Sequence, residues 1–185
     1  MARAKISINQ TKDVHTLLNT YGPFVFYADM FENPTSADWA VNSLASMVYD
    51  TSATVRAFDD TTAEAVGFSV YVPSNITKMK LTFLGRPASA PSSAKNVGFS
   101  LYAKAFPHNA AVGAWSSAFV AGTIVMPDSV AYYQRNTIEI TLGSDEGEFN
   151  INANCEYQFE LARKIDVTNN LTGDYYLRVL QVTFE

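Results

Sequence analysis

The chain has 185 residues, of which 48% are hydrophobic and 17% charged, and its formal net charge is -5 at neutral pH. This composition excludes a disordered chain, and the negative charge argues against a nucleic-acid partner, because phosphate-backbone binding needs a basic face. A single cysteine excludes an intrachain disulfide, and no apolar run is long enough to span a membrane. We therefore expect one globular, aromatic-rich β-domain that is made in a reducing cytosol and carries no cofactor.

Residues 1–53 differ in pattern from the rest and are interpreted as an N-terminal arm. Apolar side chains recur at helical spacing over 13–23 and again over 34–50, so the arm is predicted to hold two short helices. The stretch FVFYADMF between them, residues 24–31, is predicted to be extended. We expect this arm to pack on the main body or on a partner, because two short helices and one strand are too little for a stable domain.

From Thr54 onward the hydrophobic pattern changes to period two, which is typical of half-buried antiparallel strands. Clusters of Pro, Gly, Asn, Asp and Ser separate the alternating runs, as strand connections do. The predicted strands cover residues 54–58, 67–73, 78–86, 96–106, 117–127, 136–143, 155–163 and 175–185. Residues 54–185 are therefore predicted to form an antiparallel β-sandwich of jelly-roll type with about eight strands, able to fold without the arm.

The run CEYQFELAR, residues 155–163, shows how the alternation assigns faces. Cys155 shares one face with Tyr157, Phe159 and Leu161, whereas Glu160 belongs to the opposite, polar face. The cysteine is therefore predicted to be a core residue rather than a nucleophile.

Three groups of residues are candidates for catalysis or metal binding. His108 is predicted to lie in a turn, where Pro, His and Asn are ordinary turn residues, and no Gly-x-Ser-x-Gly motif accompanies it. Two acidic clusters could supply carboxylates for glycoside hydrolysis or oxygen ligands for Ca²⁺. They consist of Asp59, Asp60 and Glu64, and of Asp145, Glu146 and Glu148. Neither has EF-hand spacing, so solvated turn charge is the preferred interpretation and weak calcium binding the alternative. We expect no enzymatic activity.

Aromatic and basic residues are the candidates for partner contacts. Trp115, Tyr132 and Tyr133 lie near predicted strand ends, where they could form a sugar-stacking platform, a subunit contact or ordinary edge packing. In the arm, the candidate contact residues are Arg3, Lys5, Lys12, Phe24, Phe26 and Tyr27.

The run from VRAF to NAAVGAW, residues 55–115, contains a Val-Gly-Phe strand, a second strand, a Pro/Ser loop and a third strand that ends in a turn with tryptophan. This order resembles the β-domain of virion structural proteins of tailed bacteriophages, over roughly residues 54–185. The resemblance implies a capsid decoration protein that binds the major capsid protein in the virion and self-associates, with a trimer as the first expectation. The alternative is a carbohydrate-binding jelly-roll module, either a tail receptor-binding or a lectin-like one.

Overall fold

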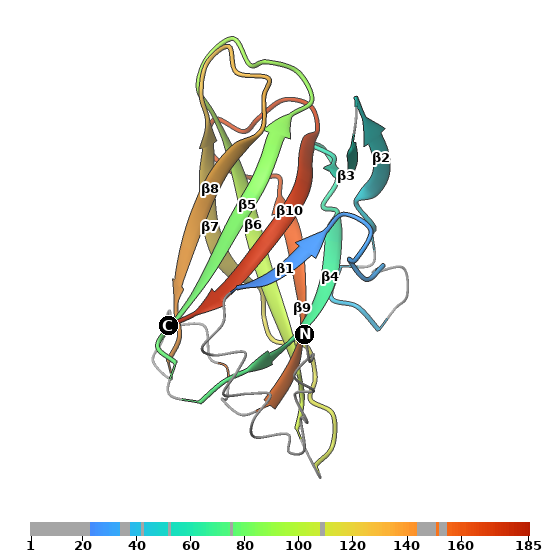
Figure 1. Ribbon diagram of the computed structural model, residues 1–185, viewed down its shortest axis with the longest axis vertical. Helices are drawn as coiled ribbons and strands as arrows, with labels where there is room; N and C mark the ends of the chain where they lie inside the picture. Colours follow the sequence, from blue (N-terminus) through green and yellow to red (C-terminus); the bar gives the residue numbers. More distant parts are fainter. Residues whose placement is uncertain are drawn as a thin grey trace, which may run out of the picture.

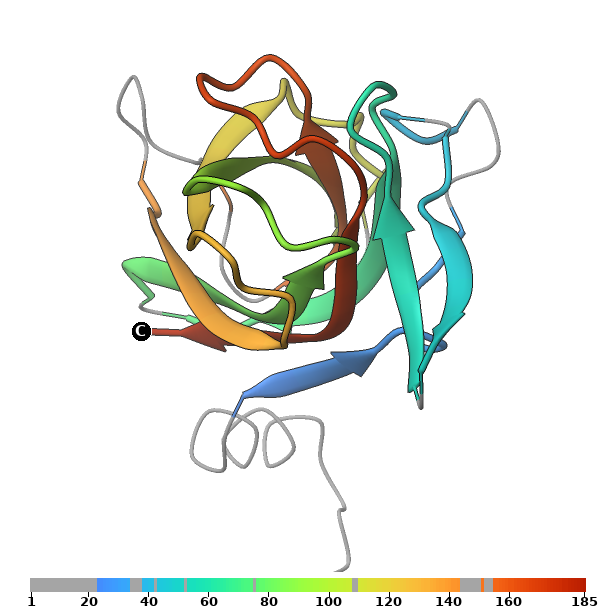
Figure 2. The ribbon, with the colours of Figure 1, turned by 90° about the horizontal axis from the view of Figure 1, so that it is seen from above.

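The computed structural model describes residues 23–33, 38–41, 43–51, 53–74, 76–107, 110–143, 151 and 155–185. Within these ranges the regular structure consists of β-strands, which form two antiparallel sheets around one core (Figures 1 and 2). No helix in the described ranges has the length and apolar character that crossing a membrane requires.

The strands follow one another along the chain in ten elements. They are β1 Phe24–Tyr27, β2 Ser46–Asp50, β3 Ala53–Phe58, β4 Ala65–Val72, β5 Lys78–Pro87, β6 Lys95–Phe106, β7 Phe119–Met126, β8 Gln134–Thr141, β9 Cys155–Lys164 and β10 Tyr175–Phe184. Each alternating run predicted beyond Thr54 corresponds to one of β3 to β10, and the extended stretch predicted at 24–31 contains β1. The structure adds β2.

Strand β10 is the centre of the larger sheet. That sheet has the order β2-β3-β10-β5-β8, and β1 also pairs with β10, on the side where β3 pairs with its first residues. The smaller sheet has the order β4-β9-β6-β7. The structure confirms the predicted antiparallel β-sandwich: the protein is mainly β, and its two antiparallel sheets face each other.

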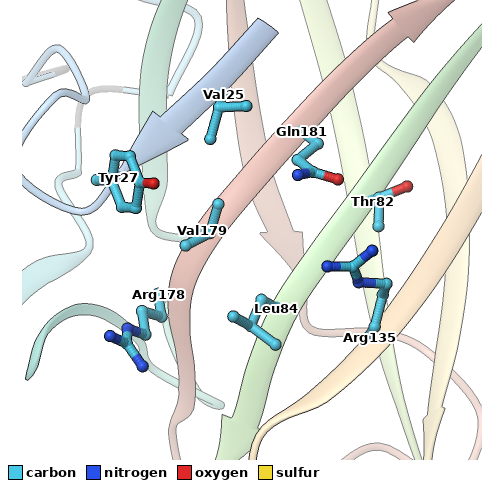
Figure 3. A pocket seen from close by; sticks show the side chains of 8 residues that line it. All are labelled: Val25, Tyr27, Thr82, Leu84, Arg135, Arg178, Val179 and Gln181. Carbon is cyan, nitrogen blue, oxygen red and sulfur yellow. The ribbon is translucent and has the colours of Figure 1, made fainter. Parts of the chain in front are cut away.

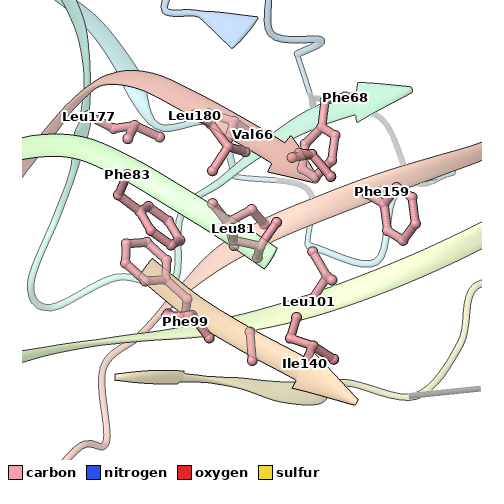
Figure 4. Packing of buried hydrophobic residues seen from close by; sticks show 14 of the residues in the cluster. Val66, Phe68, Leu81, Phe83, Phe99, Leu101, Ile140, Phe159, Leu177 and Leu180 are labelled. Atoms are coloured by element: carbon pink, nitrogen blue, oxygen red, sulfur yellow. The ribbon is translucent and has the colours of Figure 1, made fainter. Parts of the chain in front are cut away.

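Aromatic side chains from the two sheets meet in the core (Figure 4). Phe83 of β5 stacks on Phe99 of β6 at 4.8 Å between ring centroids, and Phe26 of β1 packs on Phe68 of β4 at 5.1 Å. The predicted inward positions of β9, among them Cys155 and Leu161, are buried. Burying one such large side chain contributes about 1.5–3 kcal/mol, so these two sheets hold each other together.

The helix predicted over 34–50 is wrong where the structure describes that segment. Residues 38–41 form turns, and β2 pairs residue by residue with β3 from Ser46↔Ala57 to Asp50↔Ala53. The spacing of Val41, Leu44 and Val48 fits a helix, but a short helix makes few internal hydrogen bonds, whereas β2 gains a full ladder with β3. The helix predicted over 13–23 falls outside the described residues, apart from Pro23.

Glu160 of β9 is the exception to the predicted faces. It occupies a position on the polar side of the strand, yet it is fully buried. The turn at 38–41 covers this part of the smaller sheet, and its backbone N–H groups at Ala40 and Val41 donate to the carboxylate of Glu160 at 2.9 and 2.7 Å. Alternation predicts which face a residue occupies but not which loop covers that face.

Candidate functional site

Two adjacent cross-strand rows on the outer face of the larger sheet form a groove of about 280 Å³. In the first row Val25 of β1, Gln181 of β10 and Thr82 of β5 lie opposite one another. In the second row the order is Tyr27, Val179, Leu84 and Arg135, from β1 to β8. With Arg178, these seven residues line what we call the sheet groove (Figure 3).

A β-bulge in β10 brings Arg178 into this groove. The pairing of β10 with β5 shifts register between Leu177 and Val179, so one extra residue is accommodated there. Leu177 and Leu180 both stay buried on the core side, while Arg178 is exposed. A bulge that re-aims one side chain in this way is common beside binding sites.

The side chains of the sheet groove divide into an apolar floor and polar sides. Val179 and Leu84 lie between Tyr27 and Arg178 on one side and Arg135 on the other (Figure 3). Tyr27 is 53% exposed, so it is accessible to a ligand in the groove. Thr82 and Gln181 add a hydroxyl and an amide, which donate and accept hydrogen bonds.

An ion pair between the half-buried Arg86 and the buried Asp50 borders the groove beyond Arg178. Arg86 donates from Nε to Asp50 at 2.9 Å, and the hydroxyl of Tyr133 donates to the same carboxylate at 2.6 Å. The Arg86 hydrogen bond holds the pKa of Asp50 far below its usual value, against the opposing effect of burial. Burial and the neighbouring carboxylate raise the pKa of Tyr133 to about 12, so this hydroxyl stays a donor at neutral pH.

The ring of Tyr133 also supports the groove. The guanidinium of Arg178 lies over it, 5.8 Å from the ring centroid, which is a cation–π distance. Because Tyr133 is fixed by its bond to Asp50, this contact orients Arg178 beside the groove.

The structure places the sequence-predicted contact residues in different surroundings. Tyr27 lines the sheet groove and Tyr133 borders it, whereas Phe24 and Phe26 pack against the core. Tyr132 is 67% exposed and does not line the groove. Arg3, Lys5, Lys12, His108 and the cluster Asp145, Glu146 and Glu148 lie outside the described residues.

Trp115 lies in the segment between β6 and β7, against the smaller sheet, and does not share a platform with Tyr133. Its ring packs on Trp39 at 5.5 Å between centroids, and the amine of Lys104 of β6 lies 5.8 Å from it. Trp39 in turn lies over Gly67 of β4, where a Cβ atom would meet the ring at 2.3 Å. The two tryptophans thus cover the part of the outer face of the smaller sheet around Gly67 and Lys104.

The acidic cluster predicted around Asp59 is assembled differently from the expectation. Asp59 and Asp60 lie with Asp174, with carboxylate oxygens within 4.8 Å of one another, whereas Glu64 accepts a hydrogen bond from the backbone N–H of Asp59. The buried guanidinium of Arg163 is attracted to all four carboxylates and so supplies positive charge to the cluster. Burial is the main reason that the pKa of Asp174 is raised. These carboxylates could hold a cation, but Arg163 already balances part of their charge.

Sequence reasoning missed Arg135, Arg178 and Gln181 as groove residues. Arg178 and Gln181 lie on the strand predicted over 175–185 and Arg135 directly precedes the one predicted over 136–143, but the groove exists only because β1, β10, β5 and β8 are neighbours in that order. One signal was present in KMKLTFLGR, where Leu84 is an apolar residue at an outward position.

No model of a known protein family matches the chain, and no curated protein matches it. Among solved structures, the CBM36-1 domain of a multidomain xylanase from the hindgut metagenome of Trinervitermes trinervoides has a TM-score of 0.50 at 10% identity, covering 86% of this chain and 95% of that one. A carbohydrate-binding module specific for non-crystalline cellulose, CBM28, has a TM-score of 0.38 at 12% identity, with coverages of 81% and 85%. The enzymatically active domain of tailspike protein 4 from bacteriophage CBA120 has a TM-score of 0.31 at 11% identity and covers 91% of this chain and 20% of that one.

The match at 0.50 shows a shared fold, a jelly-roll-like β-sandwich, and the two lower scores carry no argument. The resemblance to bacteriophage virion proteins has no support from a sequence family. A fold shared at 10% identity does not determine a function, which depends on the residues of the site.

Proposed function

We propose that this protein is a non-enzymatic carbohydrate-binding module that holds a glycan in the sheet groove. The observation that carries the proposal is the pairing of an exposed tyrosine, Tyr27, with an apolar floor and hydrogen-bonding side chains in one groove. Saccharides present apolar ring faces and hydroxyl edges, and such a groove is complementary to both. The fold shared with the CBM36-1 domain is consistent with this use but is not evidence for it.

The lining of the groove also supports binding without hydrolysis. Glycosidases use a pair of Asp or Glu side chains that flank the scissile bond. None of the eight lining residues is acidic. We therefore expect the protein to bind oligosaccharides without cleaving them.

The test is calorimetric titration of the full chain with a panel of oligosaccharides. Tyr27→Ala is expected to weaken the binding of the best ligand by about tenfold or more, which corresponds to about 1.4 kcal/mol. Tyr49→Ala is the matched control, because Tyr49 is a 73% exposed tyrosine on β2 that does not line the groove. Equal loss in both variants, or no binding to any oligosaccharide, would contradict the proposal.

The second candidate function is the virion structural protein, a capsid decoration protein that binds the major capsid protein and its own copies. The observation in its favour is β2, an edge strand of the larger sheet. Its side chains Met47, Val48 and Tyr49 are exposed although they are apolar. Exposed apolar edge strands are surfaces on which another strand can pair, and we take the partner to be a second copy of this chain.

A further inference from the structure

The sheet groove is positively charged in a protein that is negatively charged as a whole. Its lining contains two guanidinium groups, Arg135 and Arg178, and no carboxylate. The whole chain has a formal net charge of -5. The adjoining hollow, which shares Tyr27 and Arg178 with the groove, contributes a single acidic residue, Asp29.

These two arginines also differ from the other arginines that the structure describes. Arg56 and Arg163 are buried and donate to backbone carbonyls, and Arg86 is paired with Asp50. By contrast, Arg135 and Arg178 are exposed, and neither has a hydrogen-bond acceptor or a carboxylate within ion-pair distance among the described residues. The N–H donors of both groups are therefore available to a ligand.

The two groups lie on opposite sides of the apolar floor. Arg178 comes from β10 and Arg135 from β8, with β5 between them. Two strand spacings separate β10 from β8, which is roughly 10 Å. Guanidinium groups bind carboxylate and sulfate oxygens through pairs of parallel N–H donors, a geometry that suits an anionic substituent better than a neutral hydroxyl.

We infer that the glycan bound in the sheet groove is anionic, with carboxylate or sulfate groups that contact Arg135 and Arg178 while a sugar ring packs on Tyr27. This inference rests on the proposed function and adds the substrate class. The tyrosine and the floor select a saccharide, and the two arginines select its charge.

The experiment compares matched pairs of ligands by calorimetry on the full chain. Galacturonate oligomers are titrated against their carboxyl-reduced counterparts, and dextran sulfate against dextran, each at low and at high salt. We expect the anionic member of at least one pair to bind more than tenfold tighter at low salt, with a smaller difference at high salt because exposed charges are screened. The pair that shows the preference identifies the anionic group as carboxylate or sulfate.

Arg135→Gln and Arg178→Gln are each expected to weaken binding of the anionic member more than binding of its neutral counterpart, so that the ratio of the two affinities falls toward one. Lys104→Gln is the matched control, since it removes a positive charge from the other sheet. Equal affinity for both members of each pair would overturn the inference and leave the proposed function standing. Absence of binding to every member of these pairs and to every oligosaccharide of the panel would overturn both. Equally tight binding of a single-stranded oligonucleotide would show recognition of charge alone and would overturn the assignment to a glycan.

Discussion

Glu160 is a single carboxyl group whose surroundings make the stability of the protein depend on pH. Burial raises its pKa to about 7, although the N–H groups of Val41 and Ala40 oppose the shift. Below its ordinary pKa of about 4.3, such a carboxyl is protonated in both the folded and the unfolded state, so its ionisation does not lower the free energy of unfolding there. As the pH rises from about 4.3 to about 7, the unfolded state loses this proton before the folded state does, so the free energy of unfolding falls over this range.

We therefore predict that the free energy of unfolding falls between pH 5 and pH 8 because of Glu160, by about 1–2 kcal/mol. Glu160→Gln should remove most of this slope, because the amide does not ionise. Urea unfolding across this pH range measures the effect, and Glu156→Gln, an exposed position on the same strand, serves as the control. A slope that persists in Glu160→Gln would show that another group is responsible.

At the scale of the strands, the sequence predicted most of the fold, because apolar and polar side chains alternate along a half-buried strand and so indicate which face is buried. The alternation in CEYQFELAR places Cys155, Phe159 and Leu161 on the inward face, and all three are buried. Strand β2 was not predicted, because its apolar residues are exposed and face no core, so they follow no burial pattern. The groove was not predicted either, because the spatial order of β1, β10, β5 and β8 is not their order in the sequence.

The exposed edge of β2 leads to a prediction about association. Two copies of β2 can pair antiparallel about Val48, which sets Met47 opposite Tyr49 of the second copy and Asp50 opposite Ser46. Such a pair brings no like charges together and adds a sulfur–aromatic contact on each side. We predict a dimer in light scattering, and a monomer for Val48→Lys, because a charge on an edge strand opposes pairing.

Val125→Lys is the matched control for this prediction, since Val125 is an equally β-branched, 52% exposed residue on β7. A wild-type monomer at high concentration would contradict the pairing. A trimer would agree with the expectation from the sequence and would place the contact on another surface.

For the whole molecule, the boundary at residue 53 remains a prediction, and the structure identifies what removing the arm would cost. Arg56 is 4% exposed, and its guanidinium donates to the carbonyls of Ala28 at 2.8 Å and Phe31 at 3.3 Å. It also donates to the carbonyl of Ala45 and the side chain of Asn33. All four acceptors precede residue 53.

A chain that begins at Thr54 should therefore be much less stable than the full chain. Hydrogen bonds to a charged group contribute about 1.5–3 kcal/mol each when their loss leaves the partner unpaired, so we expect a loss of several kcal/mol, measured by urea unfolding. Arg56→Met should destabilise the full chain and affect the shortened chain far less, because its acceptors are already gone. An unchanged unfolding midpoint in the shortened chain would establish residues 54–185 as an independent unit.

The central place of β10 in the larger sheet determines how this protein can fold. It is the last strand in sequence order, yet β1, β3 and β5 all pair with it, and Phe24 near the beginning of the described chain lies opposite Val182. The hairpin of β2 and β3 can form from local contacts, but the pairs that β10 makes with β1, β3 and β5 can form only after segments far apart in the sequence meet. Because chain closure over such separations is slow, folding is expected on the millisecond-to-second timescale of all-β domains, and ribosome-bound chains that lack β10 would expose β5 along one whole edge.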